Sequence, residues 1–233
     1  MNVVLGLMST LIIYQLAKRL YQQSACLLLS PLLVCPVVII VALQLLHVSY
    51  ETYNAGGQLL SYMLQPATVA LAVPLYRYRS VIKEHLLEIV LYVSAGAVVA
   101  IVTSVGAAGL AGLPVQVADS LAPRSVTTPI AMNISQIVGG NPALTAAFVI
   151  ITGLVGTVFA SLALKYLSIE NPVTRGMMLG ISAHGTGMSK AHELGYLEGA
   201  SASLAMIFMG LITAFIAPGL VPVCLKLFGG TYV

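Results

Sequence analysis

The chain alternates between long apolar runs and short polar stretches. Between Leu86 and Leu113, for example, Glu88 is the only charged residue. In a bilayer, only helices and closed barrels satisfy all of their backbone hydrogen-bonding groups. A barrel strand alternates apolar and polar residues over about ten positions, whereas these runs stay apolar over the length of a membrane-spanning helix. The pattern therefore predicts transmembrane helices.

The polar stretches divide the chain into about eight predicted membrane-embedded segments. These are Val3–Ala17, Ala25–Leu46, Leu59–Leu75, Leu86–Leu113, Val115–Val138, Ala143–Tyr166, Gly176–Lys190 and Ala200–Leu227. The first is interpreted as a retained span rather than a signal peptide, because Lys18 and Arg19 follow the apolar run instead of preceding it. We therefore predict an all-α polytopic membrane protein with a single integral membrane domain over residues 1–233.

Composition excludes several other classes of protein. Hydrophobic residues make up 59% of the 233 residues and charged residues 7%, whereas a soluble domain carries roughly 25% charged residues. The net charge of +3 is too small and too scattered for a nucleic-acid-binding face. Cys26, Cys35 and Cys224 lie in apolar runs without metal-ligand spacing, and the motifs of soluble hydrolases and P-loop enzymes are missing. We expect no metal, no cofactor and no enzymatic activity.

Cationic stretches give the predicted topology, because they mark the cytoplasmic side of a membrane protein. Lys18–Gln23 and Arg77–His85 fall on this side if two helices separate them. Lys165 and Arg175 lie on the same side only if one of the segments Val115–Val138 and Ala143–Tyr166 does not cross the membrane completely. The better candidate is Val115–Val138, which contains prolines, charges and hydroxyl side chains. We expect a re-entrant hairpin or a broken helix there.

The first interrupted segment, Ala118–Met132, reads ADSLAPRSVTTPIAM. Each of its two prolines removes a backbone donor and clashes with the preceding turn of a helix. Its polar side chains are Arg124, Ser125, Thr127 and Thr128. An ionisable residue at membrane depth indicates a functional site. The alternative is that Arg124 lies at the interface and extends to lipid headgroups.

The second interrupted segment, Gly180–Glu198, reads GISAHGTGMSKAHELGYLE. Its glycines permit unusual dihedral angles, although close packing between membrane helices would also use them. His184 lies deepest in the apolar pattern, while Lys190, Glu193 and their charged neighbours also fit an interfacial loop. Leu64–Val69 resembles Leu121–Val126, which leaves an inverted repeat with halves 1–113 and 114–233 open.

Two interrupted helices are typical of a transporter site, because the amino ends of half-helices attract anions. The predicted substrate-binding residues are Arg124, Ser125, Thr127, Thr128, His184, Gly185, Thr186 and Lys190. Arg124 or Lys190 would counter a carboxylate, and Glu193 or His184 would carry a coupled proton. A hole-forming protein, a membrane scaffold and an intramembrane enzyme are the alternatives. A scaffold does not explain the two polar segments, and a hole-forming protein would not need them.

Several motifs resemble the LrgB/CidB family of bacterial membrane proteins. The resemblance covers Pro123–Met132, Ala183–Gly187, Glu193–Leu194, Glu198–Ala200, Ser30–Leu33 and Gln65–Tyr76. Arg124 stands where a lysine is common in the family, Ser30 where an asparagine is common, and Lys190 where an arginine is common.

The resemblance implies two functions and a location in the bacterial inner (cytoplasmic) membrane. The family is described as antiholin-like, acting with a small holin-like partner of the LrgA/CidA type on murein hydrolase export and lysis. It is also similar to the plastid glycolate/glycerate translocator and is linked to pyruvate uptake. We predict a carrier for a small monocarboxylate such as pyruvate, glycolate or lactate. We expect it to work by an elevator-like movement, to form a homodimer and to contact membrane lipids. The alternative is an antiholin-like protein that modulates lysis.

Overall fold

The computed structural model of the chain describes residues 2–24 and 29–228, which fold almost entirely into helices. Cys26 lies outside these residues. The helices form two compact units, Met1–Val69 and Ala70–Val233. The boundary after Val69 does not coincide with residue 113, where the sequence places the junction between two repeat halves. The inverted repeat and the single domain stay predictions.

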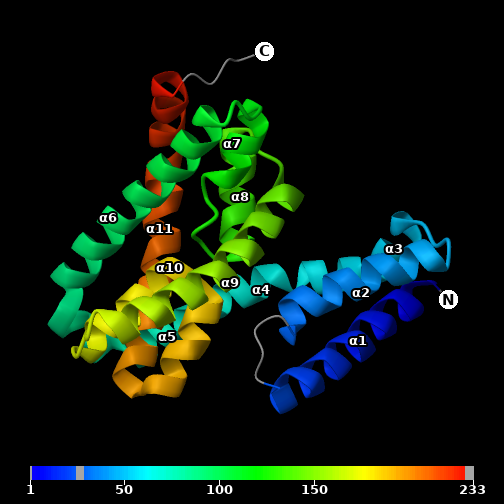
Figure 1. Ribbon diagram of the computed structural model, residues 1–233, viewed down its shortest axis with the longest axis horizontal. Helices are drawn as coiled ribbons and strands as arrows, with labels where there is room; N and C mark the ends of the chain where they lie inside the picture. Colours follow the sequence, from blue (N-terminus) through cyan, green and yellow to red (C-terminus); the bar gives the residue numbers. More distant parts are fainter. Residues whose placement is uncertain (1, 25–28, 229–233) are drawn as a thin grey trace. The chain divides into compact units, whose positions relative to one another are not determined.

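The N-terminal unit contains α1 (Asn2–Ser24), α2 (Pro31–Leu45), α3 (Tyr50–Tyr62) and most of α4 (Leu64–Ala70). Helix α1 lies beside α2 and α3 (Figure 1). A Cβ at Gly6 would lie 2.6 Å from the Tyr53 carbonyl oxygen, so glycine permits the close approach of α1 and α3. The hydroxyls of Thr10 and Tyr53 are 2.7 Å apart at the same contact. Glycine and a hydroxyl pair therefore join these two helices.

The C-terminal unit contains the segments in which the sequence predicts a site. Its helices are α5 (Ala72–Arg77), α6 (Arg79–Leu110), α7 (Val115–Leu121), α8 (Thr128–Val138), α9 (Pro142–Tyr166), α10 (Pro172–Leu194) and α11 (Tyr196–Leu227). Helices α9 and α10 each begin at an Asn-Pro pair. The Oδ1 atoms of Asn141 and Asn171 accept bonds from the first free N–H groups, and the proline that follows suits the first helical turn.

Helix α11 lies at the centre of this unit, beside α6 and α10 (Figure 1). Its buried residues between Glu198 and Ala205 are mostly small, which lets α10 come close. A Cβ at Gly180 of α10 would collide with the carbonyl oxygen of Ala202. Glycine is therefore required at this crossing by space rather than by backbone conformation.

We expect Gly180→Val to lower the free energy of unfolding by about 1–3 kcal/mol, because the added methyl groups overpack the α10–α11 contact. Thermal unfolding of the purified protein in detergent measures the change. Gly219→Ala in α11 is the control, since nothing lies within 4 Å of a Cβ at that position. An unchanged unfolding temperature in Gly180→Val would show that α10 and α11 are far enough apart at this crossing to accept a side chain.

Four helical runs among the described residues are long and apolar enough to cross a membrane. They are Tyr50–Arg77, Arg79–Leu110, Pro142–Tyr166 and Tyr196–Leu227. Helices α1 and α10 also form where segments are predicted, but their polar and charged residues keep them out of this set. Eight membrane-embedded segments therefore stay a prediction.

The polar stretch between the predicted segments Ala25–Leu46 and Leu59–Leu75 is helical for most of its length. The Ser49 side chain accepts a bond from the backbone N–H of Thr52 and starts α3 at Tyr50. The local cap thus outweighs the polarity of Glu51 and Asn54, and the helical run begins nine residues before the predicted Leu59.

Candidate functional site

The first predicted interruption coincides with non-helical backbone. Helix α7 ends at Leu121, and α8 begins at Thr128. Between them the backbone N–H of Arg124 donates to Leu121, and that of Val126 donates to Pro123. Thr127 is extended, with φ −61° and ψ 143°, and its side chain makes no capping bond. The turn therefore projects Arg124 and Ser125 from a break between two helices, and a re-entrant path through the membrane stays a prediction.

Arg124 reaches from this break to two other helices. Its Nε donates to Ser104 Oγ of α6 at 2.7 Å, and its Nη1 donates to Thr152 Oγ1 of α9 at 3.4 Å. The guanidinium forms no ion pair among the described residues. Among the described residues, this half-buried cation is thus held only by hydroxyl groups, and most of its five N–H donors have no partner there.

The second predicted interruption lies at His184 within α10. Its backbone has φ 36° and ψ −114°, which breaks the helical course. The residue is 6% exposed, and its buried Nε2 has no hydrogen-bond partner among the described residues. A strained backbone and an unpaired ring nitrogen at one residue indicate a functional position.

Helix α9 brings the two interruptions together. Thr152 contacts Arg124, and a Cβ on the next residue, Gly153, would lie 2.8 Å from Cε1 of His184. Thr186 donates to the Gly153 carbonyl oxygen at 2.8 Å. We call Arg124, Thr152, Gly153, His184 and Thr186 the α9 site. The structure therefore places three of the predicted residues around consecutive positions of one helix.

The other predicted residues near the breaks differ in their surroundings. Ser125 is buried, and Thr128 is half-buried at the start of α8. Thr127 Oγ1 is buried without a partner in the described part of the chain. Gly185 is exposed, and nothing lies within 4 Å of a Cβ built on it. Among the described residues, Thr127 is thus the hydroxyl of this group that is both fully buried and unpaired.

Lys190 and Glu193 lie away from the α9 site. They pair with each other at 2.7 Å, and their side chains are 43% and 62% exposed. Lys190 lines a pocket with Ser161 of α9, which is nine residues beyond Thr152. At 1.5 Å per residue this is about 14 Å along the helix. The structure therefore does not bring Lys190 and Arg124 to one carboxylate, and the Glu193 side chain is exposed.

Asp119 is a buried acid that the sequence prediction did not include among the site residues. It is 5% exposed, and its Oδ1 has no partner among the described residues. The turn at Gly139 and Gly140 lies against it, where a Cβ on Gly139 would be 3.3 Å from Oδ2. Asp119 is the only aspartate of the chain, in an apolar run five residues before Arg124. The presence of one aspartate in an apolar run is the sequence signal that could have identified Asp119 as a site residue.

Hydroxyl groups hold the backbone around Asp119. Ser120 Oγ accepts from the backbone N–H of Asn141 at 2.8 Å. Thr145 Oγ1 lies 2.9 Å from the Ser120 carbonyl oxygen and 2.7 Å from Ser135 Oγ. These contacts tie α7, α8 and α9 together, so the position of Asp119 is set by three helices.

Comparisons with known proteins agree with the resemblance seen in the motifs. The profile of the LrgB-like family matches residues 10–223. The chain is 47% identical to the uncharacterized protein YwbG of Bacillus subtilis (strain 168), over 92% of this chain and 96% of that protein. It is 33% identical to antiholin-like proteins LrgB of Bacillus mycoides and Bacillus cereus, over 93% of this chain and 95% of theirs. No solved structure gives a significant match.

Proposed function

Because the chain belongs to the LrgB-like family and is a multi-pass membrane protein with several long apolar helices, we propose that it carries a small monocarboxylate across the membrane. The observation behind the proposal is Arg124, a half-buried cation without an acidic partner among the described residues. A charge taken out of water needs an opposite charge nearby. A carboxylate matches the planar donor pair of a guanidinium, so it is the anion that best fits this group.

Two further polar atoms support a substrate with an oxygen next to the carboxylate. Thr127 Oγ1 and His184 Nε2 are buried, and neither has a partner among the described residues. Buried polar atoms cost free energy unless they are paired. A 2-oxo or 2-hydroxy acid such as pyruvate, glycolate or lactate would supply an oxygen for one of them. The small size of such an acid suits a site bounded by Gly153 and hydroxyl side chains.

In this proposal, transport is coupled to a proton that Asp119 carries. A coupling carboxylate must be shielded from water in part of the cycle. Asp119 is buried without a cationic partner in the described part of the chain, whereas buried Glu198 lies 3.7 Å from Arg175. Glu193 is exposed and paired with Lys190. Asp119 therefore fits the coupling role better than Glu193 or Glu198.

The test is uptake of labelled pyruvate into liposomes that contain the purified protein, with and without an inward proton gradient. We expect saturable uptake that unlabelled glycolate and lactate reduce and that the gradient increases. Liposomes without protein are the control for diffusion. Equal leakage of pyruvate and of an unrelated sugar, without saturation, would contradict a carrier and favour a hole-forming protein.

The second candidate function is antiholin-like modulation of murein hydrolase export and lysis. The observation that favours it is the name of the relatives at 33% identity. In this case a small holin-like membrane protein of the LrgA/CidA type would be the partner. Deleting the gene would then change the rate of lysis. Expressing the Arg124→Gln variant in the deletion strain would restore the wild-type rate as fully as expressing the wild-type protein does. The inner-membrane location, the dimer and the elevator-like movement stay predictions under either function.

A further inference from the structure

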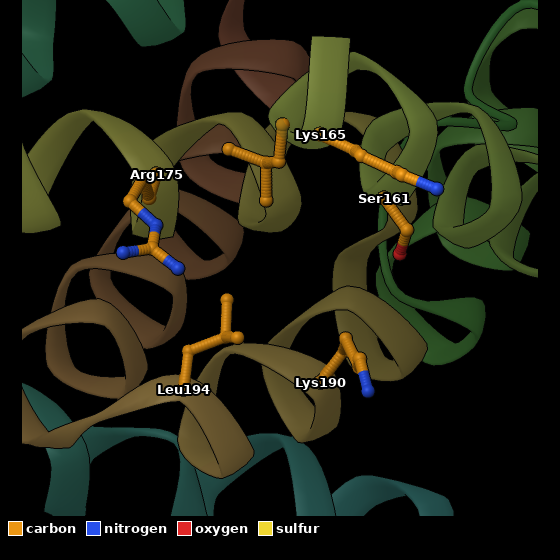
Figure 2. A pocket seen from close by; sticks show the side chains of 6 residues that line it. Ser161, Lys165, Arg175, Lys190 and Leu194 are labelled. Carbon is orange, nitrogen blue, oxygen red and sulfur yellow. The ribbon is translucent and has the colours of Figure 1, made fainter. Parts of the chain in front are cut away.

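A pocket of about 230 Å³ lies between the end of α9 and both ends of α10. It is lined by Ser161, Leu164, Lys165, Arg175, Lys190 and Leu194. Figure 2 shows Arg175 on one side of the opening, with Ser161 and Lys165 across from it and Lys190 and Leu194 along another edge. Cations from the end of α9 and from both ends of α10 thus lie around one opening.

The lining carries three positive charges and no negative charge. Lys165 has no acidic partner among the described residues, while Arg175 lies 3.7 Å from Glu198 and Lys190 lies 2.7 Å from Glu193. The Lys190–Glu193 pair is exposed, and exposed pairs contribute little free energy. Lys165 can therefore turn to an anion in the pocket, and Lys190 can do so at little cost by leaving its exposed pair with Glu193.

The pocket lies at the end of an apolar helix, where a membrane-spanning helix is expected to meet water. Lys165 is in the last turn of α9, one of the helices long enough to cross a membrane. Phe159 and Tyr166 of the same helix are 67% and 75% exposed, as expected for side chains in lipid and at the interface. Basic pockets between membrane helices at this depth bind the headgroups of anionic lipids. Leu164 and Leu194 add an apolar wall beside the cations.

We propose that this pocket binds the phosphate group of an anionic ligand, which comes from a phospholipid headgroup or from a soluble phosphate. Lys165 and Lys190 bind the phosphate as point charges, and Arg175 and the Ser161 hydroxyl donate to its oxygens. The site is independent of the α9 site, because its nearest α9 residue is nine positions beyond Thr152. The proposal therefore does not depend on carboxylate transport.

The test uses delipidated protein in a neutral detergent, titrated with phosphatidylglycerol, phosphatidylcholine or inorganic phosphate. Native mass spectrometry counts the bound lipid, and thermal unfolding reports the stabilisation by each ligand. The site variant is Lys165→Gln with Lys190→Gln, which leaves the pair of Arg175 with buried Glu198 intact. The control variant is Lys18→Gln with Lys83→Gln, which removes the same charge at exposed positions outside the pocket.

We expect phosphatidylglycerol to bind the wild type and the control variant in preference to phosphatidylcholine. The site variant should bind it about 30-fold more weakly, at about fivefold for each lysine near a membrane surface. The same loss with inorganic phosphate would support the site and identify a soluble ligand. The proposal is overturned if both variants lose the same affinity, because total charge would then explain binding. It is also overturned if the site variant binds as the wild type does.

Discussion

Arg124→Gln will reduce saturable pyruvate uptake at least 100-fold, without unfolding the protein. The glutamine keeps a donor for Ser104 or Thr152, whose hydroxyls bind the guanidinium in the wild type. It removes the charge and the bidentate geometry that a carboxylate requires, and two charge-assisted hydrogen bonds are together worth about 3–6 kcal/mol. The measurement is initial uptake into liposomes at several pyruvate concentrations.

Arg124→Lys separates charge from geometry in the same assay. Lysine keeps the positive charge but acts as a single point, so we expect it to retain part of the uptake with a higher KM. Arg79→Gln is the control for loss of a cation, because Arg79 is exposed at the start of α6. Unchanged uptake in folded Arg124→Gln would remove the main support for the carboxylate site.

Asp119→Asn will abolish accumulation driven by a proton gradient while it preserves exchange. The amide has nearly the shape of the acid but neither gains nor loses a proton, so a carrier with this change moves substrate without coupling. We expect pyruvate–pyruvate counterflow within about twofold of the wild type, since the amide is nearly isosteric with the buried acid and the change breaks no ion pair among the described residues. Uptake against a gradient should fall to the level of protein-free liposomes.

Glu193→Gln is the matched variant, because the sequence pattern predicts Glu193 as the proton carrier. Its exposed side chain pairs with Lys190, so we expect both accumulation and counterflow to stay near wild-type levels. The reverse result, in which Glu193→Gln loses accumulation and Asp119→Asn keeps it, would transfer the coupling role to Glu193. Loss of counterflow in Asp119→Asn would show instead that Asp119 is needed for folding or substrate binding.

The positions of the helix breaks could be predicted from the sequence because their causes are local. Pro123 and Pro129 cannot donate within a helix, and the polar residues between them have few partners in lipid. His184 stood out as a polar residue deep in an apolar pattern, and the backbone breaks at this residue. The family, too, could be recognised from short motifs, and the match over residues 10–223 confirms it.

The composition of the site could not be predicted in the same way, because it depends on contacts between helices. Lys190 and Glu193 share a sequence segment with His184, yet α10 carries them about 9–14 Å further along its axis. Thr152 and Gly153 look like ordinary residues of an apolar helix until α9 is placed against Arg124 and His184. Asp119 likewise gains its environment from the distant turn at Gly139 and Gly140.

The backbone of His184 has a consequence for the balance between stability and activity. A residue other than glycine in such a conformation costs about 1–3 kcal/mol, and an unpaired buried nitrogen adds about 1–3 kcal/mol. Glycine would adopt the same dihedral angles without a side chain to bury. The chain therefore has a more stable alternative at this position, and selection for thermostability alone would be expected to replace the histidine there first.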